Sequence, residues 1–187
     1  MDWFVQNYNI ISVAFFLVVA IVFHLVTPSN YDWRENSISE LAAQKYNYKW
    51  IMQIGLIGFG FLLGGGVLIK LTQAVVVWFM EIPILIYAIS MSLSGVFCTK
   101  PFFESDDYSH FEDRAHSLFA NLAGISFSLG VAVRMVFAEF LLDFVLNTAF
   151  LLLVLAGSMA FSKVSSRRGI VQRGIFFLGF LWLVILY

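Results

Sequence analysis

Six apolar stretches, each long enough to cross a membrane, fill most of this sequence. A helical span needs about 20 predominantly apolar residues. Hydrophobic residues make up 60% of the chain and charged residues 12%, against roughly 25% charged in ordinary soluble domains. The sequence therefore predicts an all-α fold, a single transmembrane domain over residues 1–187. Its six spans are expected at residues 8–27, 50–71, 74–98, 115–137, 140–162 and 170–187.

The distribution of basic residues predicts an orientation. The loops after the first, third and fifth spans share one membrane face, called here the odd face. Both termini and the other loops share the opposite, even face. The even face carries Lys70 and Arg134, whereas the odd face carries Arg34, Lys45, Lys49, Lys100, Arg114, Lys163, Arg167, Arg168 and Arg173. Because Lys and Arg accumulate in cytoplasmic loops, we expect a cytoplasmic odd face and both termini outside.

Two odd-face loops carry helix-capping signals. Ser37 and Glu40 form a Ser-x-x-Glu capping box, which predicts a short interfacial helix after the first span. Ser109 and Glu112 repeat the pattern before the fourth span, where Glu112 and Asp113 also suit a first helical turn. These acidic residues therefore have a structural interpretation beside any functional one.

The histidines gather at the odd face with these carboxylates. His116 lies about one turn into the fourth span, on a side rich in small and polar residues that includes Asn121. Polar groups at this depth face the bundle interior. We therefore expect a polar cavity that opens to the odd face, walled by the first, second and fourth spans and roofed by the short helix. Its predicted pocket residues are Ser39, Asn121, His24 and His110.

Several functions fit such a cavity. Our first hypothesis is recognition or handling of a lipid headgroup. An alternative is an intramembrane lipid hydrolase or transferase, with His116 as general base oriented by Glu40 or Asp113. A metal could assist through His110, Glu112 and His116, although no paired-histidine motif supports it. No haem is expected and the cofactor stays undetermined. A further alternative is a purely structural or partner-binding membrane protein.

Charged residues also approach the even face. Lys70, Glu81, Arg134 and Asp143 lie at similar depth, so we expect ion pairs of Lys70 or Arg134 with Glu81 or Asp143. The functional alternative is a polar path from Glu81 to the histidines, as a small-solute or ion transporter requires.

Partner classes can also be narrowed. The net charge of −1 and the lack of a basic soluble patch argue against nucleic acid, and leave membrane lipids as the expected partners. In the second span, Gly60 and Gly64 form a small-x-x-x-small motif. Such motifs allow close helix contact, so a homodimer through this face is possible.

A run of motifs resembles a known family. Pro28 is followed by Asn-Ser-Ile-Ser-Glu-Leu-Ala-Ala over residues 36–43, then Trp50 opens a glycine-rich span and His116 lies at the start of the fourth. This pattern resembles the prokaryotic multi-pass family called domain of unknown function 998, and more distantly the DRAM/Sfk-type six-span superfamily. The resemblance implies six helices, a prokaryotic plasma membrane and a tie to lipids, without an activity. The eukaryotic relatives imply a lumenal first loop, opposite to the charge count.

Overall fold

The computed structural model describes residues 2–73, 78–164 and 166–187, and the described part of the chain forms six long helices, which confirms the predicted all-α bundle. All six are long and apolar enough to cross a membrane. The first four residues of the predicted third span, 74–77, lie outside the described residues. The elements are α1 (Asp2–His24), η1 (Ile38–Ala42), α2 (Lys49–Gln73), α3 (Trp78–Val96), α4 (His110–Val136), α5 (Leu141–Lys163) and α6 (Arg168–Ile185).

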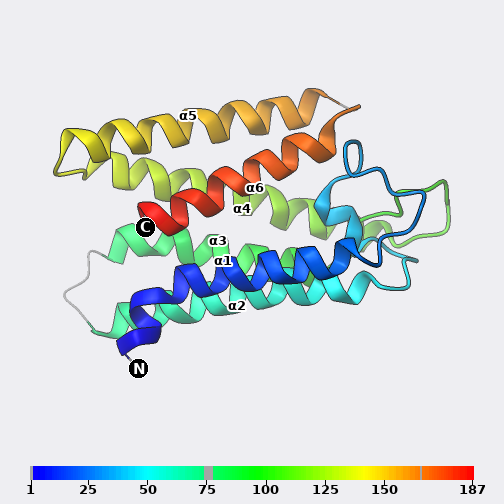
Figure 1. Cartoon of the computed structure of the whole chain (residues 1–187), viewed down its shortest axis with the longest axis horizontal. Helices are drawn as coiled ribbons and strands as arrows, with labels where there is room; N and C mark the ends of the chain where they lie inside the picture. Colours follow the sequence, from blue (N-terminus) through cyan, green and yellow to red (C-terminus); the bar gives the residue numbers. More distant parts are fainter. Residues whose placement is uncertain (1, 74–77, 165) are drawn as a thin grey trace.

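The helices run up and down between the two faces. Each long helix packs against the next in sequence, and α6 also contacts α1. Figure 1 shows both termini at the left, with the long loops after α1 and α3 at the right. α4 and α5 lie close together at their left-hand turn and separate toward the right, which is the odd face (Figure 1). This separation determines where the bundle is hollow.

The predicted caps at the odd face are formed in part. The Ser37 amide donates to Glu40 Oε2 at 2.6 Å, as in the predicted capping box. The helix that follows is a 3₁₀ turn, and its Leu41 and Ala42 are buried against the bundle. Ser109 Oγ accepts from the Glu112 amide at 3.3 Å. With Ser109 as its cap, α4 begins five residues before the predicted fourth span. The Glu112 carboxylate, however, accepts from the Cys98 amide at 3.2 Å and not from Ser109.

Aromatic side chains form a buried layer in the middle of the bundle. Phe16 of α1 contacts Phe59 of α2 at a centroid distance of 5.9 Å, and Phe59 contacts Tyr87 of α3 at 5.9 Å. Tyr87 in turn lies 5.2 Å from Phe127 of α4, which lies 5.2 Å from Trp182 of α6. Each such pair adds about 0.5–1.5 kcal/mol beyond the burial of apolar area. The layer thus joins five helices and leaves α5 at the periphery.

The glycine-rich face of α2 is used within the chain. A Cβ atom on Gly60 would overlap the Ala88 carbonyl oxygen and the Ser92 hydroxyl of α3, and one on Gly64 would lie 3.4 Å from the Ala88 Cβ. The close approach predicted for Gly60 and Gly64 is therefore an α2–α3 contact. The homodimer expected through this face stays a prediction, and it would have to share the face with α3.

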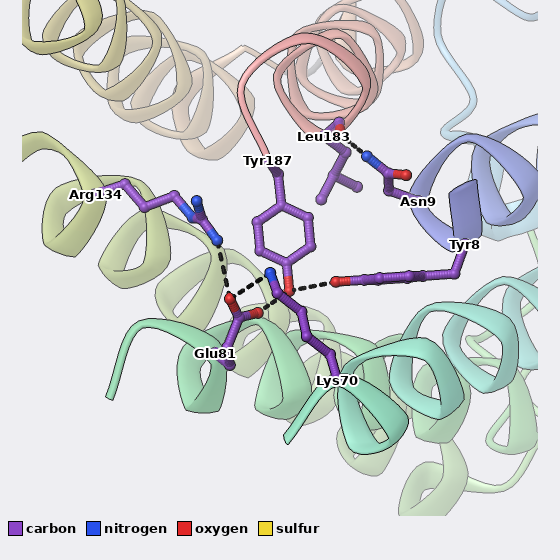
Figure 2. Close-up of polar contacts among 7 residues, drawn as sticks. All are labelled: Tyr8, Asn9, Lys70, Glu81, Arg134, Leu183 and Tyr187. Atoms are coloured by element: carbon purple, nitrogen blue, oxygen red, sulfur yellow. Dashed lines mark hydrogen bonds and ion pairs between the residues drawn. The ribbon is translucent and has the colours of Figure 1, made fainter. Parts of the chain in front are cut away.

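A buried carboxylate ties the helices together at the even face (Figure 2). Glu81 of α3 accepts from Lys70 Nζ of α2 at 2.6 Å and from Arg134 Nη2 of α4 at 3.1 Å. The Tyr187 hydroxyl donates to the other oxygen of Glu81, and the Tyr8 hydroxyl of α1 lies 3.0 Å from the Tyr187 hydroxyl. The guanidinium of Arg134 also lies over the Tyr187 ring, 4.4 Å from its centroid. The predicted ion pairs with Glu81 are confirmed.

Asp143 does not join this cluster. Among the described residues it forms no ion pair, and its backbone oxygen accepts from Asn147 of its own helix at 2.8 Å. The reason is geometric: α5 does not pack closely on α2, which carries Lys70, and Arg134 of the neighbouring α4 is turned toward Glu81.

An apolar layer separates the Glu81 cluster from the odd face. Three apolar residues lie about one helical turn closer to the bundle centre than the cluster. They are Ile84 of α3, Val131 of α4 and Leu183 of α6, which follow Glu81, Arg134 and Tyr187 in that direction. All three are fully buried. Three buried apolar side chains thus lie between Glu81 and His116, whereas the transporter alternative, which stays a prediction, requires a continuous polar path between them.

We predict that Glu81→Gln destabilises the protein by about 2 to 4 kcal/mol. The substitution leaves Lys70 and Arg134 without their carboxylate, and breaking a buried pair costs roughly 3–5 kcal/mol. The expected value is lower because a third of the Lys70 side chain is exposed. Asp143→Asn removes the same charge from a residue without an ion pair and should cost less than about 1 kcal/mol. Unfolding in mixed micelles measures both, and equal losses would contradict a structural role for the Glu81 cluster.

Candidate functional site

A cavity of about 710 Å³ lies between α3, α4, α5 and α6. It begins near the odd face and follows α4 from His116 to Phe127, a length of about 16 Å at the rise of an α-helix. Toward the odd face its lining residues are rich in polar side chains: Ser39, His116, Asn121, Ser158, Ser162 and Gln172. Deeper in the bundle they are mainly apolar, with Ser128 as a polar exception: Tyr87, Ala123, Phe127, Val154 and Gly179. The cavity is thus amphiphilic along its length.

The walls differ from the prediction. α4 is a wall as expected, but α2 contributes only Leu56 and α1 contributes no lining residue. The reason is the close packing of α1 on α2. Gly58 lies against the ring of Phe15, and Gly66 lies against the ring of Tyr8, so no space remains between these helices.

His116 is held in a defined orientation at the polar end. The residue is 4% exposed, and its Nδ1 lies 2.7 Å from the Ser94 carbonyl oxygen and 3.0 Å from the Phe97 carbonyl oxygen. Both partners are acceptors, so Nδ1 carries the hydrogen. The ring therefore caps carbonyl groups at the end of α3, which the helix itself leaves without partners. Nε2 has no hydrogen-bond partner among the described residues.

Asn121 lies on α4 just beyond His116, toward the bundle centre, and its side-chain amide makes no hydrogen bond within the described part of the chain. By contrast, the serines of α5 are already engaged. Ser158 Oγ donates to Val154 O at 2.9 Å, and Ser162 Oγ donates to Met159 O at 2.8 Å. Asn121 and the Nε2 atom of His116 are thus the polar groups best able to bind a molecule in the cavity.

Gln172 closes the polar end from α6. Its Oε1 accepts from the Ile38 amide at 2.6 Å, and its Nε2 donates to Ser39 Oγ at 3.2 Å. These bonds tether η1 to α6 above the cavity, as the predicted roof requires. The sequence analysis did not single out Gln172, although a lone amide one turn into an apolar span is a signal that could have identified it.

The carboxylates proposed for catalysis have other partners. Glu40 Oε2 accepts from the Ser37 amide at 2.6 Å. Asp113 Oδ1 accepts from the Lys100 amide at 2.7 Å and from the Thr99 hydroxyl at 3.0 Å. Among the described residues neither carboxylate is hydrogen-bonded to His116. The structure therefore brings His116, Ser39 and Asn121 to one cavity, and uses Glu40 and Asp113 to hold loops.

The other two histidines lie outside this cavity. His24 lines a second cavity of about 560 Å³, between α1 and α6, together with Arg173 and apolar residues such as Phe16. His110 is exposed, and its ring lies 4.5 Å from the Tyr108 ring. Shared membrane depth did not predict a shared site, because α6 stands between His24 and the larger cavity.

The metal set predicted as His110, Glu112 and His116 is not assembled. Within the described ranges, no three His, Cys, Asp or Glu side chains are grouped so that they could hold a metal ion. Glu112 is turned toward the Cys98 amide and His116 toward the carbonyls of α3. The hydrogen-bonding demands of the loop backbone thus orient these side chains.

These features define a multi-pass α-helical membrane protein with an amphiphilic cavity at one end. The model of the family described as Protein of unknown function (DUF998) matches residues 10–187. The chain therefore belongs to this family, which confirms the nearer of the two resemblances seen in the sequence. No curated protein and no solved structure matches the chain.

We predict that His116→Leu destabilises the protein by about 1–3 kcal/mol, because two buried carbonyl groups lose their donor. His116→Asn should retain most of the stability, since its side-chain amide nitrogen can replace Nδ1 as a donor. Thermal unfolding in detergent compares the two variants. If His116→Asn is as unstable as His116→Leu, the proposed role of Nδ1 is wrong.

Proposed function

We propose that this protein binds a membrane lipid in the cavity between α3, α4, α5 and α6. The headgroup would lie among His116, Asn121 and Gln172, and an acyl chain would extend past Gly124 toward Phe127. The observation that carries the proposal is the gradient of the cavity lining, from polar near the odd face to apolar near the bundle centre. A lipid has the same gradient from headgroup to chain.

The exposure of the lining residues supports entry from the membrane. On α4, Asn121, Gly124 and Ile125 are exposed, and on α5 the same holds for Leu155 and Ser158. The cavity is therefore open on the side where α4 and α5 separate. A lipid could enter laterally there, without passing through the polar loops.

Binding fits the site better than hydrolysis or group transfer. A general base of the predicted kind needs His116 oriented by Glu40 or Asp113, and both carboxylates bind backbone amides elsewhere. Ser39 is engaged with Gln172 and with the Ser37 hydroxyl, 3.1 Å away. The free groups, the Asn121 amide and His116 Nε2, suit hydrogen bonds to a headgroup.

We predict that Gly124→Leu abolishes the retention of lipid in this cavity. A Cβ at Gly124 meets no atom within 4 Å, so the larger side chain should project into the cavity without disturbing the fold. Native mass spectrometry of the protein released from mild detergent should show lipid adducts on the wild type and their loss in Gly124→Leu.

Gly174→Leu is the matched control for this experiment. Gly174 lies on α6, is equally free of neighbours within 4 Å, and does not line the cavity. Its lipid adducts should match those of the wild type. Wild-type protein without lipid adducts, or equal adducts in the Gly124→Leu and Gly174→Leu variants, would overturn the proposed function.

We also propose that the odd face is cytoplasmic and that the membrane is the plasma membrane. The support is the excess of Lys and Arg in the odd-face loops. The distant resemblance to the DRAM/Sfk-type superfamily suggests the opposite orientation. If the charge count is the better guide, the polar end of the cavity meets the cytoplasmic leaflet.

Cysteine labelling decides between these orientations. In a Cys98→Ala background, Asp106→Cys marks the odd face and Glu139→Cys the even face, since both positions are exposed. We predict that a membrane-impermeant maleimide labels the protein with Glu139→Cys on intact cells, and the protein with Asp106→Cys only after lysis. The reverse pattern would overturn the cytoplasmic assignment.

A further inference from the structure

The cavity has a positively charged mouth. The described residues that line it include no Asp or Glu side chain. Three exposed cations, Lys163, Arg167 and Arg168, lie in the connection from α5 to α6 at the odd face. None of the three forms an ion pair within the described part of the chain.

Arg168 is placed at this mouth by an aromatic contact. Its guanidinium lies 4.8 Å from the centroid of the Phe161 ring, and Phe161 lines the cavity. An arginine above an aromatic ring is attracted to the face of the ring, and its N–H groups at the edge of the guanidinium plane remain available. Arg167, the preceding residue, shows no comparable contact with an aromatic ring among the described residues.

The acidic residues of the odd face do not neutralise Arg168. Glu40, Glu112 and Asp113 accept hydrogen bonds from backbone amides, and Asp107 is paired with Lys45 at 2.8 Å. The backbone of Glu35 lies beside the start of α6, since its carbonyl oxygen accepts from the Gly169 amide at 3.2 Å. Its carboxylate, however, forms no ion pair with Arg168.

We infer that the lipid bound in this cavity is an anionic phospholipid, whose phosphate is recognised by Arg168. This inference rests on the proposed lipid-binding function and specifies its ligand. An arginine presents paired N–H donors that match the oxygens of a phosphate. The contact with Phe161, a lining residue in the last turn of α5, places this donor pair at the odd-face end of the cavity. The negative charge of the headgroup complements a mouth that has cations and no lining carboxylate.

The experiment is native mass spectrometry of the full chain with equal amounts of phosphatidylglycerol and phosphatidylcholine. We expect the wild type to retain phosphatidylglycerol preferentially, and Arg168→Gln to lower that preference roughly tenfold, the effect of losing one charge-assisted hydrogen bond. Arg167→Gln is the matched control, because it removes an adjacent exposed cation that does not contact Phe161. It should keep the wild-type preference.

Distinct outcomes separate this inference from the proposed function. Lipid adducts that Gly124→Leu removes, but that show no preference for phosphatidylglycerol, would overturn the inference and leave the lipid site intact. Equal effects of Arg167→Gln and Arg168→Gln would also overturn it, since general surface charge would explain them. A last arm adds inorganic phosphate, and displacement of phosphatidylglycerol by millimolar phosphate would overturn the assignment of the site to a lipid.

Discussion

The carboxylate of Glu81 is the interaction on which the arrangement of the helices depends. A buried charge in a membrane protein is costly unless it is paired. Glu81 has this pairing only when Lys70 of α2, Arg134 of α4 and Tyr187, just beyond α6, all reach it. Tyr8 of α1 is joined to it through the Tyr187 hydroxyl. Each of these helices must therefore end at one depth on the even face, and this requirement fixes their register.

The even-face cluster and the aromatic layer together explain why the cavity lies toward the odd face. Both hold α1, α2, α3, α4 and α6 close together. α5 is linked to the aromatic layer only through Asn147, whose Oδ1 accepts from Trp182 Nε1 of α6 at 2.8 Å in the described part of the chain. α5 leaves its short turn beside α4 and then diverges (Figure 1). The space between them is not filled, because Gly124 and Ala120 of α4 have small side chains there.

The sequence predicted features that depend on one helix or on depth in the membrane. It gave the spans, the pairing of Lys70 and Arg134 with Glu81, and the placing of Ser39, Asn121 and His116 at one cavity. The predictions were wrong where the result depends on how a helix is rotated about its own axis and on which helices pack beside it. The sequence does not reveal that Gly60 faces α3, that α6 screens His24 from the cavity, or that the Glu112 carboxylate reaches the Cys98 amide.

The tautomer of His116 connects the fold to the function. In a catalytic triad, a carboxylate accepts the Nδ1 hydrogen of the histidine and stabilises the imidazolium that forms. Here the neutral carbonyls of Ser94 and Phe97 accept that hydrogen, so the ring is oriented without gaining an anionic partner. The same bonds cap α3, which makes the orientation of the ring part of the fold. An oriented ring whose Nε2 has no partner among the described residues suits a hydrogen bond to a headgroup, while the phosphate is left to the cations at the mouth.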